Sequence, residues 1–434
     1  MNVQRQRSDT WGRRAELTSQ NSFLGSVDEA FILRIAFLFS GQFALYEGFQ
    51  DWNRGRADIH PEVAVLTLTI YGVSLFIIAM SLMPSKFVLR FRDLPLLPFA
   101  LATVTSLYVV AAIAYKGAYR TDVLAYSHYA ALLFAGQGTN PYVTDMAKAL
   151  SMFAVQPSDL TPLMSGTYLT TFQYPALHFL VFVPFVWLGL QDMRWVLVLF
   201  EIGVVLVLYL RGPRNLKPML LIPLFAGSDL MINFTAASVS DALWVLPLVF
   251  TALYVEKPVH AGVFYGLACA MKQTPWVLAP FLLIYMLRTT DNRDLHDRLL
   301  RVVKFTATSV ALFVVANLPF LIASPNAWFR NVMTPLAEDL VILSQGPSLL
   351  TQVGLLPVGR MFYTVLAVAV AVVLMVNYYV YFDHLKYALW IFPGIILWFS
   401  YRALTNYIIY WTPLILVSLI LWYEAEHAKV AHSG

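Results

Sequence analysis

Asp122 and Arg120 are the first residues along this sequence that are suited to chemistry. They lie near the start of a long polar segment at residues 116–173. A carboxylate at the mouth of a helical bundle can accept a proton from an attacking hydroxyl group or bind a metal. Asp122 could instead cap a helix, because Thr121 and Asp122 are common residues at a helix start. Arg120 could bind an anionic group of a substrate or anchor the chain at lipid headgroups.

Two further ionisable residues, Asp241 and Lys272, lie among apolar residues. Ionisable groups inside membrane segments are costly and usually face a cavity or a partner. Asp241 opens an apolar segment, so helix capping near water is its alternative role. Lys272 and Gln273 precede Pro275, which should break the helix and leave a helix N-terminus beside the ammonium group. That arrangement suits a phosphate, and a tight hairpin with Lys272 reaching the interface is the alternative.

Two later segments could complete a site. Residues 324–360 form a second long polar segment, and loops of this length are usually functional. It could cover the first segment as a lid. Arg402 precedes the last apolar segment and is another candidate for a phosphate, although Tyr and Arg are also common at membrane interfaces. The sequence has no Walker A, Rossmann or HExxH motif.

The composition indicates a membrane protein. Hydrophobic residues make up 59% of the 434 residues and charged residues only 12%, whereas soluble domains contain about 25% charged residues. The net charge of +4 is small for this size and does not suggest nucleic-acid binding. The polar residues 1–27 lack the apolar core of a signal peptide, so the first apolar segment is expected to be retained as a span.

The apolar segments predict an all-α, polytopic helical bundle with no separate soluble domain. Basic residues in short loops place both termini in the cytoplasm and residues 116–173 and 324–360 outside. The apolar segments give thirteen candidate spans, and this topology requires that one of them does not cross the membrane. We expect residues 174–190 to be re-entrant, which leaves about twelve crossings. The thirteen candidates are residues 28–46, 61–83, 94–115, 174–190, 193–210, 217–233, 239–255, 258–271, 274–288, 302–323, 361–381, 385–400 and 404–423.

These segments give a simple domain organisation. A polar N-terminus at residues 1–27 precedes one membrane domain at residues 28–424, and a polar tail follows at residues 425–434. Within the first polar segment, residues 122–135 have helical spacing and one polar side, which predicts a short helix along the membrane surface. Gly136 and Gly138 should end this helix.

The order of the polar motifs resembles that of GT-C integral-membrane glycosyltransferases. The resemblance is to glycosyltransferase family 87 and the related polyprenyl-phosphate-mannose-dependent mannosyltransferases, and it extends from about residue 100 onward. Residues 1–93 lie outside it, and Pro175-Ala176 stands where the family often has two prolines. The matching motifs are Arg120-Thr-Asp122 with Gly136-Gln-Gly-Thr-Asn-Pro-Tyr142, Gln173-Tyr-Pro-Ala-Leu177, Ser240-Asp-Ala-Leu243, Gly266-Leu-Ala-Cys-Ala-Met-Lys-Gln-Thr-Pro275, Gln345-Gly-Pro-Ser-Leu349, Arg402 with Asn406-Tyr407, and Trp411-Thr-Pro413.

The resemblance implies a GT-C-like bundle and inverting transfer of a sugar, mannose above all, from a polyprenyl-phosphate donor to a lipid or glycan acceptor. Asp122 would be the general base or would position the acceptor. The donor phosphate, which leaves as an anion, needs stabilising charge. The implied substrate-binding residues are Arg120, Lys272 and Arg402 for the phosphate, Tyr126, Tyr142 and Tyr174 for the sugar and acceptor pocket, and the neighbouring Asp241 and Gln273.

The same resemblance implies an enzyme of the cell envelope, in a prokaryotic plasma membrane with its active site facing outside. No cofactor is expected, and a divalent metal is left open but not indicated, because the acidic pairs that bind metal in some GT-C enzymes are not evident. The alternative function is a transporter or flippase for a lipid-linked or anionic substrate. Transporters often show paired repeats with matching broken helices, whereas this sequence shows one break, near Lys272.

Overall fold

The computed structural model describes residues 29–55, 60–98, 100–101, 104, 119–213, 217, 234–289, 294–334 and 338–433. The polar N-terminus at residues 1–27 lies outside the described residues, as do most of the expected spans at 94–115 and 217–233. The described residues form helices, 3-10 turns and two isolated β-bridges.

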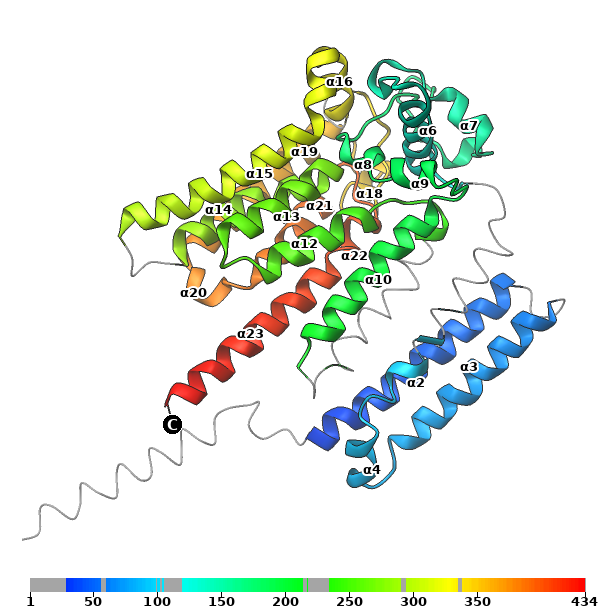
Figure 1. Cartoon of the computed structure of the whole chain (residues 1–434), viewed down its shortest axis with the longest axis vertical. Coiled ribbons are helices and arrows are strands. Elements are labelled where there is room, and N and C mark those ends of the chain that lie inside the picture. Colours follow the sequence, from blue (N-terminus) through cyan, green and yellow to red (C-terminus); the bar gives the residue numbers. More distant parts are fainter. Residues whose placement is uncertain are drawn as a thin grey trace, which may run out of the picture. The chain divides into compact units, whose positions relative to one another are not determined.

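The chain divides into two compact units. The first unit contains Met1–Ser106 and Pro213–Phe225, and the second contains Leu107–Gly212 and Ala226–Gly434. In the first unit, α2 (Glu29–Gly55) and α3 (Pro61–Met80) lie side by side (Figure 1). The short helix α4 (Ser85–Arg90) packs on the same pair, and the shared core consists of Leu33, Phe37, Ile77, Met80 and Val88.

The second unit is an array of long and short helices that contains all the expected site residues. Their bounds are α6 (Asp122–Gln137), η2 (Pro141–Val143), α7 (Ala147–Met152), η3 (Pro157–Asp159), α8 (Leu177–Leu180), α9 (Val183–Trp187), α10 (Arg194–Arg211), α12 (Ala242–Leu253), α13 (Pro258–Met271), η4 (Thr274–Leu278), α14 (Ala279–Arg288), α15 (Leu295–Ala323), α16 (Pro325–Val332), α18 (Leu349–Gln352), α19 (Arg360–Val380), α20 (Phe382–Leu385), η5 (Ala388–Trp390), α21 (Phe392–Trp398), α22 (Asn406–Ile409) and α23 (Thr412–Ser433).

Helix α13 packs between α12 and α15 at the centre of this unit (Figure 1). Two glycines one turn apart on α13 make the approach to α15 close. A Cβ atom would lie 2.6 Å from the carbonyl oxygen of Phe305 if built on Gly262, and 2.6 Å from that of Ser309 if built on Gly266. Small residues at this spacing let two membrane helices meet backbone to backbone.

Five helices in the described residues are long and apolar enough to cross a membrane. These spans are Glu29–Gln50, Pro61–Met80, Leu295–Ala323, Arg360–Val380 and Asn406–Ala425, and shorter apolar helices accompany them. An all-α membrane protein is therefore confirmed, whereas the expected count of about twelve crossings is not. The expected re-entrant segment at 174–190 consists of α8 and α9, whose lengths of 4 and 5 residues are too short to cross.

Helix α6 differs in its surroundings from the surface helix that the sequence suggested. It ends at Gln137, where Gly138 adopts the left-handed conformation with φ 64°, as the two glycines predicted. Its first half, however, is covered on every side, because the run from Leu124 to Ala131 is buried without interruption. The polar side chains of this run bond inside the protein: Nδ1 of His128 lies 2.9 Å from the hydroxyl oxygen of Tyr119, which also accepts from the N–H of Met193.

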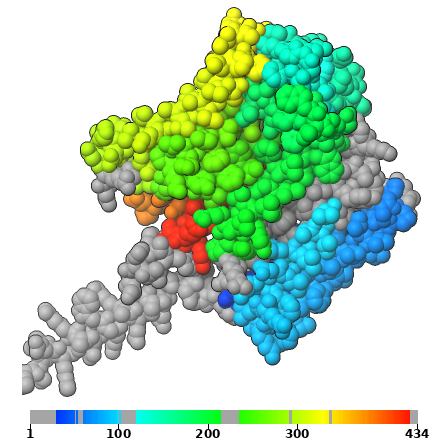
Figure 2. Space-filling view, in the orientation of Figure 1, coloured from blue at the N-terminus to red at the C-terminus, as the bar shows by residue number. Residues whose placement is uncertain are grey.

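The two polar segments, which we call the first polar loop (residues 116–173) and the second polar loop (residues 324–360), are joined by backbone pairing. Leu163 and Leu340 form a β-bridge. The N–H of Met164 donates to Asp339 at 2.8 Å, and the N–H of Val341 donates to Pro162 at 3.2 Å. Helix α16 of the second polar loop also packs on η2 of the first, and the two segments meet on the face drawn in Figure 2.

Candidate active site

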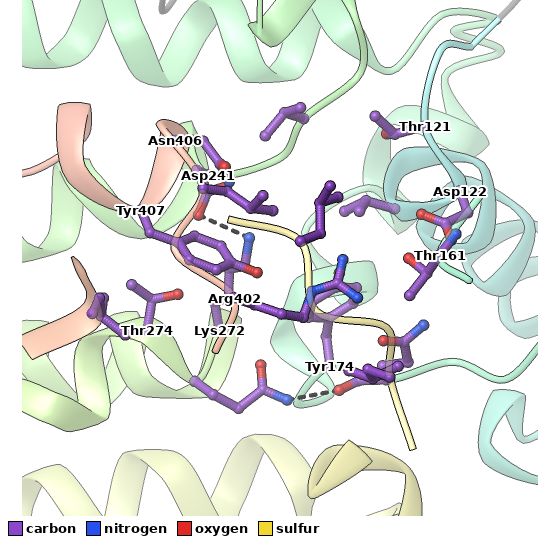
Figure 3. A pocket seen from close by; sticks show the side chains of 18 of the residues that line it. Thr121, Asp122, Thr161, Tyr174, Asp241, Lys272, Thr274, Arg402, Asn406 and Tyr407 are labelled. Atoms are coloured by element: carbon purple, nitrogen blue, oxygen red, sulfur yellow. Dashed lines mark hydrogen bonds and ion pairs between the residues drawn. The ribbon is translucent and has the colours of Figure 1, made fainter. Parts of the chain in front are cut away.

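A pocket of about 500 Å³ opens in the second unit where both polar loops meet the breaks between its helices (Figure 3). Backbone segments before α12, after α13 and after α21 contribute to its walls together with the start of α6. The structure thus brings together side chains that are up to 287 positions apart in the sequence, as between Arg120 and Tyr407. Seven of the nine expected site residues line it, namely Arg120, Asp122, Tyr174, Asp241, Lys272, Gln273 and Arg402.

Asp122 occupies the first turn of α6 and is only 3% exposed. Its Oδ2 atom accepts a hydrogen bond of 2.8 Å from the backbone N–H of Thr161. Burial raises the pKa of Asp122, and this effect outweighs the opposing effects of Thr161 and the nearby Arg402. A carboxylate with a raised pKa is a better proton acceptor than an ordinary aspartate, so Asp122 is suited to general-base chemistry.

The segment around Asp122 is fixed against the segment that leads to Asp241. The hydroxyl of Thr121 donates to the carbonyl oxygen of Ser238 at 2.7 Å, and the N–H of Arg120 donates to the Ser238 hydroxyl at 3.4 Å. Ser238 has φ 72°, a conformation that a serine rarely adopts and that these contacts help to hold. Thr121 is the N-cap of α6 but forms no side-chain cap bond, because its hydroxyl makes this tertiary contact.

Asp241 and Lys272 form a buried ion pair, with 2.8 Å between Oδ1 and Nζ. The Oδ1 atom of Asp241 also accepts from Nε1 of Trp244 at 2.7 Å, and Oδ2 accepts from Nδ2 of Asn406 at 2.6 Å. Both oxygens are therefore engaged. Asp241 stands at the N-cap position of α12 but forms no side-chain cap bond, so the pair with Lys272 replaces the capping role.

Lys272 follows the last residue of α13, and the chain resumes as a 3-10 helix at Thr274. This confirms the break at Pro275. The ammonium group lies over the ring of Tyr174 at 5.6 Å and over the ring of Tyr407 at 5.7 Å. Two aromatic faces and one carboxylate therefore fix the cation in the wall of the pocket.

Arg402 lies between the two aspartates in the view of Figure 3. Its Nη1 atom is buried and has no hydrogen-bond partner among the described residues. Buried donors are normally bonded, and a buried cationic donor is especially costly when it is not. An anion in the pocket would supply the missing acceptor.

The family model described as Glycosyltransferase family 87 matches residues 172–420, which is more than half of the chain. The chain belongs to glycosyltransferase family 87. It is therefore a membrane glycosyltransferase, an enzyme that moves a sugar from a donor to an acceptor. Comparisons with curated proteins and with solved structures found no match.

The matching range contains one part of the glycosyltransferase pocket and not the other. Asp241, Lys272 and Arg402 lie inside residues 172–420, whereas Arg120 and Asp122 precede that range. The structure supplies the link that the family match leaves out, because it places Asp122 in the same pocket as the matched cations.

His178 is a residue of the glycosyltransferase that the sequence analysis did not identify. Its Nδ1 atom lies 2.6 Å from the carbonyl oxygen of Met271, and its Nε2 atom lies 2.9 Å from the hydroxyl of Ser240. A carbonyl oxygen only accepts, so Nδ1 carries the hydrogen and Nε2 accepts from Ser240. The ring also stacks on Tyr174 at 4.3 Å. His178 thus connects the residues just before Lys272 and Asp241.

Two expected site residues, Tyr126 and Tyr142, do not line the pocket. The hydroxyl of Tyr126 donates to the carbonyl oxygen of Leu169 at 2.6 Å, and that of Tyr142 donates to the carbonyl oxygen of Tyr174 at 2.6 Å. Both residues are almost completely buried. In this structure they brace the first polar loop behind the pocket wall, and only Tyr174 of the three expected tyrosines reaches the pocket.

Gln273 does line the pocket, and its amide connects three segments. Nε2 donates to the carbonyl oxygens of Gln173 and Val332, at 2.7 and 2.8 Å. These bonds hold the entry to α8 and the end of α16 beside the break that follows α13. The direct role expected for Gln273 in substrate binding stays a prediction.

Among the pocket residues outside the expected set, Thr161, Asn406 and Tyr407 contact the charged side chains directly. Thr161 donates its backbone N–H to Asp122, and its side chain also acts on that carboxylate. No motif in the sequence marked Thr161 as a partner of Asp122. Asn406 and Tyr407 did belong to a motif shared with the family, and that motif was the available signal. Among the described residues, no group of three or more His, Cys, Asp or Glu side chains is placed to hold a metal ion.

Proposed function

We propose that this glycosyltransferase transfers a mannosyl unit from a polyprenyl-phosphate donor to a hydroxyl group of a lipid or glycan acceptor, with Asp122 as the general base. The observation that carries this proposal is the distribution of charge in the pocket. Asp241 pairs with Lys272, and Arg120 pairs with Asp159. Among the described residues, Asp122 and Arg402 form no ion pair, so one anion and one cation face the pocket for use by substrates.

The reaction follows from these two charges. The acceptor hydroxyl gives its proton to Asp122 as its oxygen bonds to the anomeric carbon of the sugar. The bond from that carbon to the phosphate oxygen breaks, and its electron pair stays on the phosphate, which leaves with one more negative charge. Arg402 and Lys272 stabilise that charge where it develops.

The arrangement supports an inverting transfer. Asp122 lies at one end of the pocket and Lys272 at the other, with Arg402 between them (Figure 3). A sugar placed between these ends would meet the acceptor on one face and lose the phosphate from the opposite face. No covalent sugar–enzyme intermediate is needed for this single displacement.

The pocket also has an apolar side that suits a polyprenyl chain. Val277 of η4, Leu397 of α21 and Leu343 of the second polar loop all line it. Val277 and Leu397 each lie five positions from Lys272 and Arg402, respectively, so they are suited to the lipid that follows the donor phosphate. The choice of mannose rests on the resemblance to polyprenyl-phosphate-mannose-dependent enzymes.

An outward-facing site is supported by the charges at the two ends of α15. This helix has 29 residues and is about 43 Å long, enough to cross a membrane. Its N-terminal end carries Arg298, Arg301 and Lys304, which favour the cytoplasm. Its C-terminal end continues into α16, which packs on the first polar loop. The pocket beside that loop is then on the outer side.

The test uses purified enzyme with polyprenyl-phosphate-mannose and a membrane lipid or glycan extract. We expect mannosylated product with the native enzyme and none above background with Asp122→Asn, because an amide cannot accept the proton. Asp145→Asn is the matched control, since Asp145 is an exposed aspartate of the same loop outside the pocket lining.

Two outcomes would contradict the proposal. Turnover that survives Asp122→Asn would remove the assigned base. Absence of turnover with any polyprenyl-phosphate sugar, together with substrate flux in liposomes, would favour the transporter alternative.

A further inference from the structure

We infer that a turn at residues 344–352 positions Arg402 for the donor phosphate, and that Gly346 and Ser348 are the positioning residues through which it acts. This inference rests on the proposed function, in which Arg402 binds the phosphate. It goes beyond that function because it assigns a role to Gln345-Gly-Pro-Ser-Leu349, a motif whose residues do not line the pocket.

Arg402 lies in a connection without helical structure, between the end of α21 at Trp398 and the start of α22 at Asn406. Backbone groups in such a connection are not bonded along a helix, so bonds to other parts of the chain determine where the connection lies. From this connection Arg402 reaches between the two aspartates of the pocket (Figure 3). The placement of its guanidinium group therefore depends on what holds the connection.

The turn supplies two hydrogen bonds to this connection, one on each side of Arg402. The N–H of Gln345 donates to the carbonyl oxygen of Ala403 at 2.7 Å. The hydroxyl of Ser348 donates to the carbonyl oxygen of Ser400 at 3.0 Å. Ser348 stands at the N-cap position of α18 but forms no side-chain cap bond, so its hydroxyl serves this tertiary contact instead.

Ser400 carries the contact on to Arg402 itself. The hydroxyl oxygen of Ser400 lies 2.8 Å from the carbonyl oxygen of Arg402 and 2.6 Å from that of Leu397. The backbone of Arg402 is thus tied to the last turn of α21, while Ser348 holds the carbonyl group of the same Ser400.

Gly346 brings the backbone of the turn directly against the connection. A Cβ atom built on Gly346 would lie 2.0 Å from the carbonyl oxygen of Trp398 and 2.9 Å from Cβ of Ala403. Real Cβ atoms essentially never approach closer than 3.0 Å, so the two segments would have to separate by about 1 Å. The nearest atom belongs to the backbone and not to a flexible side chain, so the connection that holds Arg402 would be displaced.

The turn is held by its own hydrogen bonds, which limit how far it can yield. The N–H of Gly346 donates to the hydroxyl of Ser344 at 2.8 Å, and the N–H of Ser344 donates to Oε1 of Gln352 at 3.2 Å. The carbonyl oxygen of Gly346 accepts from the N–H of Leu349 at 2.9 Å. A substitution at Gly346 should therefore move the connection rather than the turn alone.

The test measures binding of polyprenyl phosphate to the purified full-length protein. Gly346→Ala should weaken binding on the order of tenfold, as expected when a hydrogen bond to a charged group is lost. Ser348→Ala, which adds no atoms, should weaken it about threefold. Two variants of the second polar loop outside the pocket lining are controls and should bind normally: Gly359→Ala, where a Cβ would meet no atom within 4 Å, and Ser324→Ala.

The decisive measurement repeats Gly346→Ala and Ser348→Ala in an Arg402→Gln background. Because both residues act through Arg402, neither substitution should weaken binding further in that background. Weakening by the same factor in both backgrounds would indicate a general effect on the fold and would overturn the inference. Normal binding by both single variants would also overturn it. If Gly346→Ala does not fold, the Ser348→Ala pair of measurements decides alone.

Failure of the proposed function gives a different result. Binding of polyprenyl phosphate requires no sugar transfer, so it can be measured whether or not the protein uses polyprenyl-phosphate-mannose. Loss of the Gly346→Ala effect in the Arg402→Gln background, together with no transfer of mannose, would contradict the proposed reaction and leave the positioning of Arg402 supported.

Discussion

Asp122 and Asp241 line one pocket, but hydrogen-bond donors are distributed unequally between them. Asp241 is completely buried, and its two oxygens accept bonds from Lys272, Trp244 and Asn406. Asp122 accepts the N–H of Thr161 and forms no ion pair among the described residues. The three bonds hold Asp241 and its partners in place, whereas burial raises the pKa of Asp122, which suits that carboxylate to exchange a proton.

We propose that this difference separates a structural role of Asp241 from a chemical role of Asp122 within one pocket. Sequence context makes the two aspartates alike, since each stands at the start of a helix beside a hydroxyl residue. Only their partners distinguish them. The four predictions that follow test whether the distinction holds in stability, in turnover and in pH dependence.

The largest expected difference is in stability. Asp241→Asn should destabilise the protein by about 3 kcal/mol, because it leaves Lys272 as a buried, unpaired charge. Asp122→Asn should be neutral or stabilising, since its amide oxygen can still accept from Thr161 and the variant removes a costly buried charge. Thermal unfolding of both variants in the same detergent would measure this. Equal destabilisation by the two substitutions would contradict the distinction.

A second prediction combines substitutions at both members of the Asp241–Lys272 ion pair. Adding Lys272→Met to Asp241→Asn removes the unpaired cation, and we expect it to recover about 2 kcal/mol of the stability lost in the single variant. Sugar transfer should not recover, because the leaving phosphate still lacks Lys272. Unfolding midpoints and turnover of the single and double variants form the required cycle. Recovery of transfer in the double variant would show that the ion pair acts only on folding.

The third prediction concerns His178, which hydrogen-bonds to the residues that directly precede Lys272 and Asp241. His178→Phe keeps a ring to stack on Tyr174 but removes the bonds to Met271 and Ser240. Lys272 should then be less well placed for the leaving phosphate, with a loss of kcat/KM of about tenfold, in keeping with the strictness of catalytic positioning. Donors with better leaving groups should reduce the loss. The same loss for every leaving group would indicate a purely structural role.

The smallest expected effect is a displacement of the pH profile. Only ionised Asp122 accepts a proton, so kcat/KM should fall as the pH falls through the pKa of Asp122, which burial raises above its usual value. The positive charge of Arg402 lowers this pKa, so Arg402→Gln should raise it further and move the acidic limb to higher pH. Arg330→Gln, at an exposed arginine of α16, is the control. A limb that stayed in place or moved to lower pH in Arg402→Gln would contradict the assignment.

Much of the candidate site could be predicted because ionisable residues in an apolar chain are conspicuous. Asp122, Asp241, Lys272 and Arg402 were all identified in this way, and the structure places them in one pocket. The break at Pro275 also followed directly from the chemistry of proline. The partners of these residues could not be predicted. The local sequence around Asp241 is compatible both with an aspartate that caps a helix and with one that forms a buried ion pair.

The fold could also be predicted only in part: the spans followed from the sequence, and the tertiary contacts did not. Long apolar segments gave spans such as α3, α15 and α19, because their composition alone satisfies the requirement of the membrane. The burial of α6 could not be foreseen, since a helix with small and apolar residues can face lipid or protein equally well. Backbone pairing between Leu163 and Leu340 was also hidden, because β-bridges that join distant loops depend on tertiary structure and not on local side chains.

The pairing of the two polar loops has a consequence for how such enzymes could diversify. The segment that pairs at Leu163 also contains Thr161 and Asp159, whereas its partner segment lies within the family-matching range. Replacement of the first polar loop would disturb this pairing unless residues 338–341 changed with it. The two loops should therefore be inherited as a unit.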